Sequence, residues 1–578
     1  MEKSQIANIL EEIGYLLELK GENPFKTRAY ENGARVVKGL SQDLADLVAS
    51  GEISKIKGIG SALADKITEL VQTGRLEYYE KLKSAFPDGL LEMAKVPGMG
   101  PKKIRKLYEE EGITSIDALE KACQENRIAG IEGFGSKTQT KILEGIAFIR
   151  QHSNRHLYHQ AYHVAEKLLD TIRSCSGVIR AEVTGSLRRC KETVKDIDIV
   201  ASAASEDREG IMTFFTTQTA PKSIISKGET KSSIITGGGM QADLRIVADD
   251  EFPYILHHFT GSKEHNTAMR GLAKKRGLKM SEYGLFRENG ERIDCADETD
   301  IFSVFDMAFV PPELREDLGE IEAAQSDKLP HLICPDDLRG ILHAHTTYSD
   351  GANTLREMAE ACRTMGMQYL GISDHSKIVV YANGLSADRL KKQGDEIRAL
   401  NDEYSDFRIF HGTECDIMLD GTLDFSDDVL AELDFVVISV HQKLAMSQKE
   451  ATDRIVKAMQ NPHVTILGHP TGRILLEREG YPLDYDKIFA AAGENNVVIE
   501  INASPYRFDL DWRYLRQAKE YGVKLSINPD AHSTDGLADI YWGVGIARKG
   551  WLQAADVLNT MDVGDIANFF RGIKASTS

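Results

Sequence analysis

The sequence predicts a multidomain protein of mixed α and α/β class, with a helical N-terminal region, a middle domain on a mixed β-sheet and a C-terminal barrel of seven βα units. Three observations support this prediction: a Gly-x-Gly segment repeated three times in the first 150 residues, short β-rich runs between residues 179 and 247, and an alternation of apolar runs with helical segments from about residue 337. At 578 residues the chain is too long for one hydrophobic core, so several domains are expected.

The composition is that of a globular protein, with 42% hydrophobic and 28% charged residues. No apolar run is long enough to cross a membrane, and the opening MEKSQIANILEEIG is not a signal peptide, so we expect no membrane contact. Seven cysteines, scattered and without a CxxC pair, predict reduced thiols and a cytoplasmic location.

The net charge of −19 would argue against a nucleic-acid partner if it were spread evenly along the chain. It is uneven, because residues 1–150 carry 22 basic and 23 acidic side chains, whereas residues 333–578 carry 25 and 37. Basic patches in the earlier part of the chain are therefore still compatible with phosphate binding.

Three segments of the N-terminal region share the pattern apolar-x-Gly-apolar-Gly, followed by an amphipathic helix. They are IKGIGSALADKI (56–67), VPGMGPKKIRKL (96–107) and IEGFGSKTQTKI (131–142). One copy would often be only a turn, but three copies are similar to the helix-hairpin-helix motif, whose glycines permit a tight turn and whose helix N-terminus offers backbone N–H groups to a DNA phosphate. The glycines expected to contact DNA are Gly58, Gly60, Gly98, Gly100, Gly133 and Gly135.

The middle domain begins with a predicted helix at 157–173 and continues in the β-rich runs IRAEVTG, DIDIVAS, SIISKG, SSIITGG and MQADLRIV. Asp196 and Asp198 are two residues apart in one run, so their carboxylates share a face and need a cation beside them. Asp243 in QADLRIV supplies a third carboxylate. Three converging carboxylates suit Mg²⁺, and two such ions can bridge an attacking 3′-hydroxyl and a triphosphate. A surface strand with solvated aspartates is the alternative.

GSLRR, followed by D-x-D ten residues after Ser186, resembles the nucleotidyltransferase superfamily. The hairpin repeats and HFTGSKEHNTAMR (258–270) narrow the resemblance to the family X DNA polymerases, the group of DNA polymerase beta, over residues 1 to about 317. The resemblance implies that Asp196, Asp198 and Asp243 bind two Mg²⁺ ions, with Asp243 as the base for the primer hydroxyl. It also implies nucleotide contacts from Gly185, Ser186 and Arg189 to the triphosphate, from Phe259 and Gly261 to the sugar, and from Asn266 and Arg270 to the minor groove of the nascent pair.

Three positions bear on how far this resemblance extends. His258 stands where the vertebrate members have tyrosine, and Lys263 replaces an aspartate beside the incoming base, where a lysine would strengthen nucleotide binding. Lys66 aligns with the Schiff-base lysine of relatives with 5′-deoxyribose-phosphate lyase activity. Because Ala62 replaces another lysine of those relatives, simple binding of a 5′-phosphate by Lys66 is the favoured alternative.

From about residue 337, seven apolar runs alternate with helical segments: GILHAHTT, YLGISDH, RIFHGTECD, DFVVISVH, VTILGHP, VVIEINAS and KLSINPDAH. Such an alternation predicts a parallel barrel with its active site at the carboxyl ends of the strands. Nine ligand-type residues stand at or just after these ends: His343, His345, Asp350, His375, Glu414, His441, His469, Asp530 and His532. One histidine there would usually be structural, but nine predict a multinuclear metal site, and their imidazoles and carboxylates suit Zn²⁺, Mn²⁺ or Fe²⁺.

This set is similar to the polymerase and histidinol phosphatase (PHP) domain, over residues 337 to about 575. The resemblance implies up to three Mn²⁺ or Zn²⁺ ions that activate a water for attack on phosphorus. His343, His345, Glu414 and Asp530 would hold one ion, Asp350, His375 and His532 a second, and Glu414, His441 and His469 a third. Arg473 in GHPTGR and Lys443 in VHQK are candidate phosphate clamps.

Together the two resemblances predict a monomeric bacterial family X DNA polymerase that uses deoxynucleoside triphosphates on gapped or primed DNA to fill short gaps in base excision repair. Its PHP barrel would be a 3′→5′ exonuclease with an AP-endonuclease or 3′-end-processing activity. The expected domains are a lyase-like helical domain (1–85), a helix-hairpin-helix domain (86–150), a palm (151–256), a thumb-like domain (257–317), a linker (318–336) and the barrel (337–578). The alternatives are a DNA-end-processing nuclease with a non-catalytic polymerase half and a metal-dependent small-molecule phosphatase.

Overall fold

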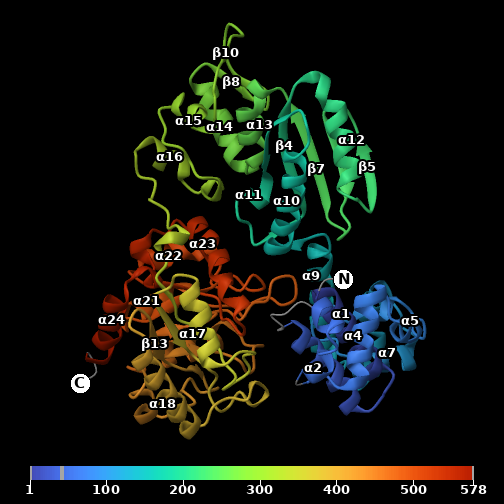
Figure 1. Cartoon of the computed structure of the whole chain (residues 1–578), viewed down its shortest axis with the longest axis vertical. Coiled ribbons are helices and arrows are strands. Elements are labelled where there is room, and N and C mark those ends of the chain that lie inside the picture. Colours follow the sequence, from blue (N-terminus) through green and yellow to red (C-terminus); the bar gives the residue numbers. More distant parts are fainter. Residues whose placement is uncertain (1–2, 39–43, 57, 576–578) are drawn as a thin grey trace. The chain divides into compact units, whose positions relative to one another are not determined.

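The computed structural model describes residues 3–38, 44–56 and 58–575, so Lys57 of the first hairpin segment lies outside the described residues. The chain divides into two compact units, residues 1–154 with 476–478 and residues 155–475 with 479–578 (Figure 1). None of the helices in the described ranges is long and apolar enough to cross a membrane. All seven cysteines are described and none forms a disulfide.

The first unit is all helical, as the sequence predicts. Its helices are α1 (Lys3–Leu19), α2 (Pro24–Lys38), α3 (Leu44–Ala49), α4 (Ser61–Thr73), α5 (Glu77–Lys83), α6 (Gly89–Met93), α7 (Pro101–Glu111), α8 (Ile116–Gln124) and α9 (Ser136–His152), with short 3-10 turns at Ile53–Lys55 and Arg127–Gly130. Their apolar faces bury two separate clusters of side chains, one built around Leu16 and Ile67 and the other around Ile104 and Phe134.

The three Gly-x-Gly segments form three equivalent turns. The first glycine of each has a left-handed backbone, with φ of +98° at Gly58, +81° at Gly98 and +92° at Gly133. The second glycines, Gly60, Gly100 and Gly135, are the N-caps of α4, α7 and α9. None of these caps has a side-chain hydrogen bond, so the first N–H groups of α4 and α9 remain available to an external acceptor, as does that of Lys102, which follows Pro101 in α7.

The second unit begins with a five-stranded mixed sheet in the order β2-β4-β7-β6-β5. The elements of this part of the chain are β1 (His156–Leu157), α10 (Tyr158–Arg173), β2 (Val178–Val183), α11 (Gly185–Arg188), β3 (Thr193–Val194), β4 (Asp196–Ala203), α12 (Arg208–Gln218), β5 (Ser223–Lys227), β6 (Lys231–Ile235) and β7 (Gln241–Val247). Strands β1 and β3 pair with each other in a separate two-stranded sheet. All five predicted β-rich runs are therefore strands. The central pair, β4 and β7, is parallel, which fixes the place of the predicted aspartates.

A smaller α/β segment follows, with α13 (Phe252–Thr260), α14 (Lys263–Lys275), β8 (Leu278–Ser281), β9 (Gly284–Arg287), β10 (Arg292–Ile293), α15 (Glu298–Ser303) and α16 (Glu320–Gln325). The basic residues between 263 and 281 are divided between a helix and a strand. Helix α14 ends at Lys275 because Gly277 adopts a left-handed φ of +68°, and Leu278 then starts a strand that pairs with β9.

Residues 311–327, PPELREDLGEIEAAQSD, are acidic and include the start of the predicted linker, and two of their charged side chains are packed inside this segment. Arg315 is fully buried and pairs with Glu298, and Glu320 is fully buried and accepts a hydrogen bond from His265 at 2.6 Å. These charges are therefore used inside this part of the molecule, which the acidic composition alone did not indicate.

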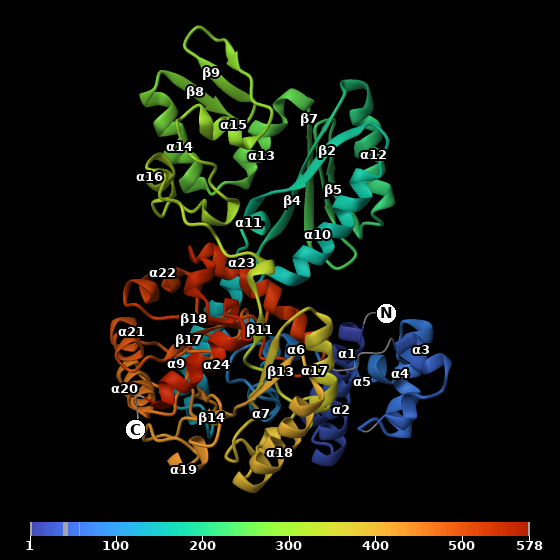
Figure 2. The same ribbon diagram turned by 60° about the vertical axis from the view of Figure 1, so that its left-hand side comes forward.

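The remainder of the second unit is a βα barrel of parallel strands (Figure 2). Its strands are β11 (Gly340–Ile341), β12 (Tyr369–Ile372), β13 (Arg408–His411), β14 (Glu414–Asp416), β15 (Val437–Ser439), β16 (Ile466–Leu467), β17 (Val498–Asn502) and β18 (Leu525–Asn528). The helices are α17 (Leu355–Thr364), α18 (Ala387–Glu403), α19 (Asp427–Leu430), α20 (Gln448–Met459), α21 (Tyr485–Glu494), α22 (Trp512–Glu520), α23 (Ile540–Lys549) and α24 (Val563–Ala575). The seven predicted runs are confirmed, with RIFHGTECD divided into β13 and β14 between His411 and Glu414.

Single bridges join the two groups of barrel strands. His375 pairs with Glu414, and Ala344 pairs with Ala531, so the ends of β12, β14, β11 and β18 are brought to one rim. Inside the barrel, Phe570 of α24 packs against Phe410 and Phe435, with ring centroids 5.2 and 5.5 Å apart. This packing fills the barrel with apolar side chains, and the polar cluster lies at the strand ends.

Candidate active sites

The first candidate site lies on the two parallel central strands of the mixed sheet. Asp198 of β4 is the direct register partner of Asp243 of β7, and Asp196 lies opposite Gln241. The structure therefore brings the three predicted carboxylates onto neighbouring strands. Asp243 Oδ2 lies 2.6 Å from Lys231 Nζ of β6, a residue that the sequence reasoning missed because it is contributed by a third strand.

The protonation of this site reflects its burial and crowded charges. Burial, followed by the charges of Asp196 and Asp243, raises the pKa of Asp198 to about 6. Burial would also raise the pKa of Asp243, but hydrogen bonds from Lys231, Gln241 and Ser233 outweigh it and lower that pKa below its usual value. Three carboxylates lie close together here, and the ammonium of Lys231 already pairs with one of them. Such a concentration of negative charge is suited to hard divalent cations.

The segment Gly185–Glu192 turns tightly beside these carboxylates. Gly185 has a φ of +64°, and a Cβ at this position would lie 2.9 Å from Asp198 Oδ2, so a side chain here would be strained and would displace that carboxylate. Arg189, predicted to bind triphosphate, is 12% exposed, and its Nε lies 3.1 Å from Glu316 Oε1. Its Nη1 also donates to the carbonyl of Thr260.

The remaining predicted nucleotide contacts lie at the junction of α13 and α14. Phe259 stacks under the guanidinium of Arg245, 4.3 Å from its ring, and Gly261 is buried. Asn266 donates from Nδ2 to the carbonyl of His258 at 2.6 Å, so its amide is engaged within the protein. Lys263 and Arg270 are exposed on α14.

In the helical unit, Lys66 lines a cavity of about 510 Å³. Its ammonium donates to the carbonyl of Ala62 at 3.0 Å and lies 5.1 Å from the ring of Tyr78. Lys26, Tyr30 and Ser61 also line this cavity, together with Gly58 and Gly60 of the first hairpin. The cavity thus combines two lysines with a helix N-terminus, which is the chemistry of an anion site.

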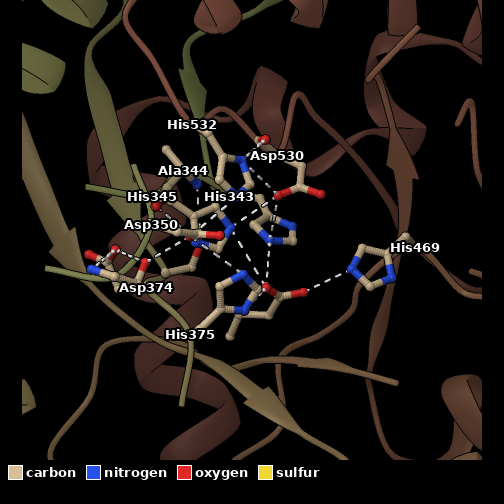
Figure 3. Close-up of polar contacts among 12 residues, drawn as sticks. His343, Ala344, His345, Asp350, Asp374, His375, His469, Asp530 and His532 are labelled. Atoms are coloured by element: carbon tan, nitrogen blue, oxygen red, sulfur yellow. Dashed lines mark hydrogen bonds and ion pairs between the residues drawn. The ribbon is translucent and has the colours of Figure 1, made fainter. Parts of the chain in front are cut away.

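The second candidate site gathers all nine predicted ligands at the carboxyl ends of the barrel strands. Figure 3 shows the rings of His343, His345, His375 and His532 facing a common space. In the described part of the chain, three groups have ligand atoms within 4.8 Å of one another. They are His345, Asp350, His375 and His532; then His343, His345 and Asp530; and then His375, Glu414 and His441.

Glu414 contacts more than one of the predicted histidine ligands: both of its carboxylate oxygens lie close to imidazole nitrogens. Its Oε2 lies 2.8 Å from His375 Nδ1, and its Oε1 lies 2.9 Å from His469 Nε2 and 3.3 Å from His441 Nε2. His343 Nε2 is buried without a hydrogen-bond partner, 3.6 Å from Glu414 Oε2 and 3.5 Å from Asp530 Oδ1. A buried imidazole nitrogen that has no hydrogen-bond partner and lies between two carboxylates is typical of a metal ligand. The residues of this cluster therefore fit a metal centre.

The charges of the cluster are strongly coupled. Burial would lower the pKa of His441, but Glu414 and Asp416 outweigh it and raise that pKa to about 10. Burial would raise the pKa of Glu414, yet His441, His375 and His343 hold it well below its ordinary range. Protonated imidazoles therefore balance the buried carboxylates here, which is the role that metal cations would take.

Three further carboxylates orient the ligands, and the sequence reasoning missed them. Glu500 accepts from His343 Nδ1 at 2.7 Å and so directs Nε2 toward the cluster. Asp416 lies 3.4 Å from His441 Nδ1. Asp374 accepts from the backbone and hydroxyl of Thr346 and from Ser349, which fixes the loop that carries Asp350. The available signal was a charged residue inside an apolar run, such as the glutamate of VVIEINAS.

The two predicted phosphate clamps differ in their surroundings. Arg473 donates to the carbonyls of Arg507 and Phe508 and pairs with Asp511 at 2.6 Å, so its guanidinium is used to hold that loop. A phosphate contact by Arg473 would require this guanidinium to leave Asp511, just as a triphosphate contact by Arg189 would require that side chain to leave Glu316. Lys443 is exposed.

Comparisons with known proteins agree with this architecture. The chain matches a helix-hairpin-helix domain at residues 1–76, a SAM-like helix-hairpin-helix tandem at 90–147, the DNA polymerase beta thumb at 255–316 and the PHP domain at 342–504. It is 40% identical over 576 residues to the DNA polymerase/3'-5' exonuclease PolX of Bacillus subtilis (strain 168), covering 99% of this chain and 100% of that protein. Probable phosphatases match a smaller part of the chain. One from Thermoanaerobacter sp. (strain X514) is 29% identical over 40% of this chain and 93% of its own length, and one from Clostridium acetobutylicum is 31% identical over 33% and 78%.

Proposed function

The chain belongs to the family X DNA polymerases that carry a PHP domain, and on that premise we propose that it extends DNA primers at Asp196, Asp198 and Asp243 and hydrolyses 3′ ends at the barrel cluster. The observation that carries the proposal is the presence of both complete ligand sets in one chain whose full length matches a polymerase with exonuclease activity. Short gaps of the kind produced in base excision repair are the proposed substrate, with deoxynucleoside triphosphates as the second substrate and a monomer as the working form.

At the polymerase site, the chain's own groups would bind and orient the reactants. Asp243 would accept the proton of the primer hydroxyl. Ser186 and Arg189 would bind triphosphate oxygens, while Phe259 and Gly261 would contact the sugar. Two Mg²⁺ ions held by the three aspartates would supply charge stabilisation for the in-line displacement.

At the barrel, the nine ligands would hold up to three Mn²⁺ or Zn²⁺ ions, which supply an activated water for phosphodiester hydrolysis. Glu414 lies between three histidines and is the proposed bridging ligand. Glu500 and Asp416 would fix the tautomers of His343 and His441. Abasic-site cleavage and cleaning of blocked 3′ ends are the further activities proposed for this site.

Separating the two sites by mutation tests the proposal. We expect Asp196→Ala with Asp198→Ala to abolish primer extension and to spare 3′ hydrolysis, because the barrel ligands are untouched. His343→Ala should do the reverse. If His343→Ala protein does not extend a primer while wild-type protein degrades one, the polymerase half is non-catalytic and the end-processing alternative holds. A folded variant that loses both activities would contradict the assignment of two independent sites.

The cavity beside Lys66 supports a second, smaller role in holding a 5′-phosphate at a gap. Lys66 donates a hydrogen bond to the carbonyl of Ala62. This contact is compatible with either role, because both a phosphate-binding ammonium and the neutral amine that a lyase needs can donate it. Borohydride trapping on an abasic substrate, compared with Lys66→Ala, distinguishes the two. A trapped adduct that depends on Lys66 would establish a lyase, whereas gap affinity that falls without any adduct would establish a phosphate-binding role.

A further inference from the structure

The nucleotide-binding segment Gly185–Glu192 is anchored to the barrel as well as to the polymerase site. At one end, Gly185 lies against Asp198. At the other, the Glu192 carboxylate accepts hydrogen bonds from Trp512 Nε1 at 3.1 Å and Arg513 Nη1 at 2.9 Å, both at the start of α22. Buried apolar side chains of the mixed sheet and the barrel form one continuous cluster, so these contacts lie beside a shared core.

Lys549, the last residue of α23, makes the central contact. Its side chain is fully buried, and its ammonium donates to the carbonyl of Arg189 at 2.9 Å, to the carbonyl of Glu313 at 3.2 Å and to Glu316 Oε1 at 2.6 Å. The ring of Trp512 lies 4.5 Å from the same ammonium. The three N–H groups of the ammonium thus meet three acceptors, one of which is the backbone carbonyl of Arg189, a residue proposed to bind triphosphate.

Glu316 links this lysine to the side chain of Arg189. Its carboxylate receives Lys549, Arg189 Nε at 3.1 Å and Lys191 Nζ at 3.2 Å, which makes one acidic group the common partner of three cations. Arg189 is therefore held twice, through its backbone by Lys549 and through its guanidinium by Glu316. The backbone of Lys191 in turn donates to the carbonyl of Ser186 at 3.0 Å, so a shift of the anchored end is transmitted to Ser186.

We propose that Lys549 of the barrel is a positioning residue of the polymerase site, acting with Glu316 to hold Ser186 and Arg189 in the geometry that receives the triphosphate. The inference rests on the proposed role of this segment in nucleotide binding. It gives the nuclease barrel a second task, because a polymerase half separated from the barrel would lack the donors Lys549, Trp512 and Arg513 that fix its own nucleotide loop. Loss of this anchor would weaken nucleotide binding without touching the barrel metals.

The test uses the full-length protein and three variants. Lys549→Met removes the buried ammonium and keeps an unbranched apolar stem, and Glu316→Gln keeps the shape of the carboxylate while removing its charge. Arg548→Met is the matched control, because Arg548 also joins the barrel to this region, through Glu313 at 2.6 Å and the carbonyl of Ile333, but has no contact with Arg189. Steady-state primer extension, 3′ hydrolysis and thermal melting are measured for each.

We expect Lys549→Met and Glu316→Gln to raise the KM for the nucleotide by about tenfold or more, since displacements of an ångström in a binding loop have effects of that order. The rate of 3′ hydrolysis should be unchanged, and Arg548→Met should keep the wild-type KM. A Lys549→Met KM equal to that of Arg548→Met would overturn the inference, as would a parallel loss of both activities and of melting temperature in both Lys549→Met and Glu316→Gln. Wild-type protein that extends no primer would instead overturn the proposed function.

Discussion

The ammonium of Lys231 lies beside Asp243, where the three neighbouring carboxylates require positive charge. The sequence shows that Asp196, Asp198 and Asp243 need positive charge, and the fold meets that need with a 39% exposed lysine whose ammonium lies 2.6 Å from Asp243 Oδ2. A mobile ammonium can leave when a divalent ion arrives. We therefore expect Lys231 to compete with a divalent ion for Asp243.

Replacing Lys231 tests this competition. We expect Lys231→Met to lower stability without Mg²⁺ by roughly 1–3 kcal/mol, because it leaves a buried carboxylate without its charged donor. Saturating Mg²⁺ should restore most of that loss, and Mg²⁺ affinity should rise. Thermal melting across a Mg²⁺ titration measures both effects. Lys227→Met is the control, since Lys227 lies on the neighbouring strand and donates to Thr213 instead. Equal Mg²⁺ responses in the two variants would contradict the idea.

At the same scale, the sequence predicted which carboxylates and histidines gather at the two candidate sites but not the charged groups that contact them. Asp196 and Asp198 could be recognised because strand alternation places i and i+2 on one face, and this depends only on local spacing. Lys231 and Glu500 could not, because each acts across strands whose register is set by the whole sheet. The engagement of Arg473 with Asp511 was equally invisible, since it depends on the path of a distant loop.

Among the elements, the three hairpins show how a short motif fixes backbone geometry. The first glycine of each turn has a positive φ, and the second caps the following helix with an ordinary φ, as Gly98 (+81°) and Gly100 (−82°) illustrate. A side chain has open space at both positions, so the two differ in conformation rather than in crowding. Element types and the repeat were predictable for that reason, whereas the end of α14 depended on one glycine, Gly277.

This pair gives a prediction about DNA binding. Gly98→Ala should cost about 1–2 kcal/mol of stability in the helical unit, because alanine resists the left-handed conformation, and should weaken DNA affinity by distorting the N-terminus of α7. Gly100→Ala, two residues on, should cost less stability, because its φ of −82° is open to alanine and only the weaker N-cap preference for glycine is lost. Melting and fluorescence anisotropy with gapped DNA at several salt concentrations measure the two effects. If the two substitutions weakened binding equally without a difference in stability, the turn geometry would not be the cause.

For the whole molecule, the charge distribution separates binding from hydrolysis. Residues 1–150 are nearly neutral in net charge and carry the hairpin turns, while the acidic excess of residues 333–578 includes the carboxylates of the metal cluster and those that orient it. A net charge of −19 is therefore compatible with a DNA enzyme, because part of it serves to bind divalent cations rather than to face DNA. The thermal stability of the barrel should consequently depend both on bound metal ions and on pH.

His441 makes that dependence measurable. In the metal-free protein, Glu414 and Asp416 raise its pKa to about 10 against a value of about 6.5 in an unfolded chain. Stability gained from the proton is complete below about pH 6.5 and is lost as pH rises through about 10. We expect chelator-treated protein to melt at progressively lower temperature between about pH 7 and about pH 10, and Mn²⁺-loaded protein to lose less, because the metal replaces the proton between the carboxylates. In the chelated His441→Asn variant the decline should be shallower. If the melting temperatures of chelated and Mn²⁺-loaded wild-type protein fell equally with rising pH, the imidazole proton and the metal would not share this site.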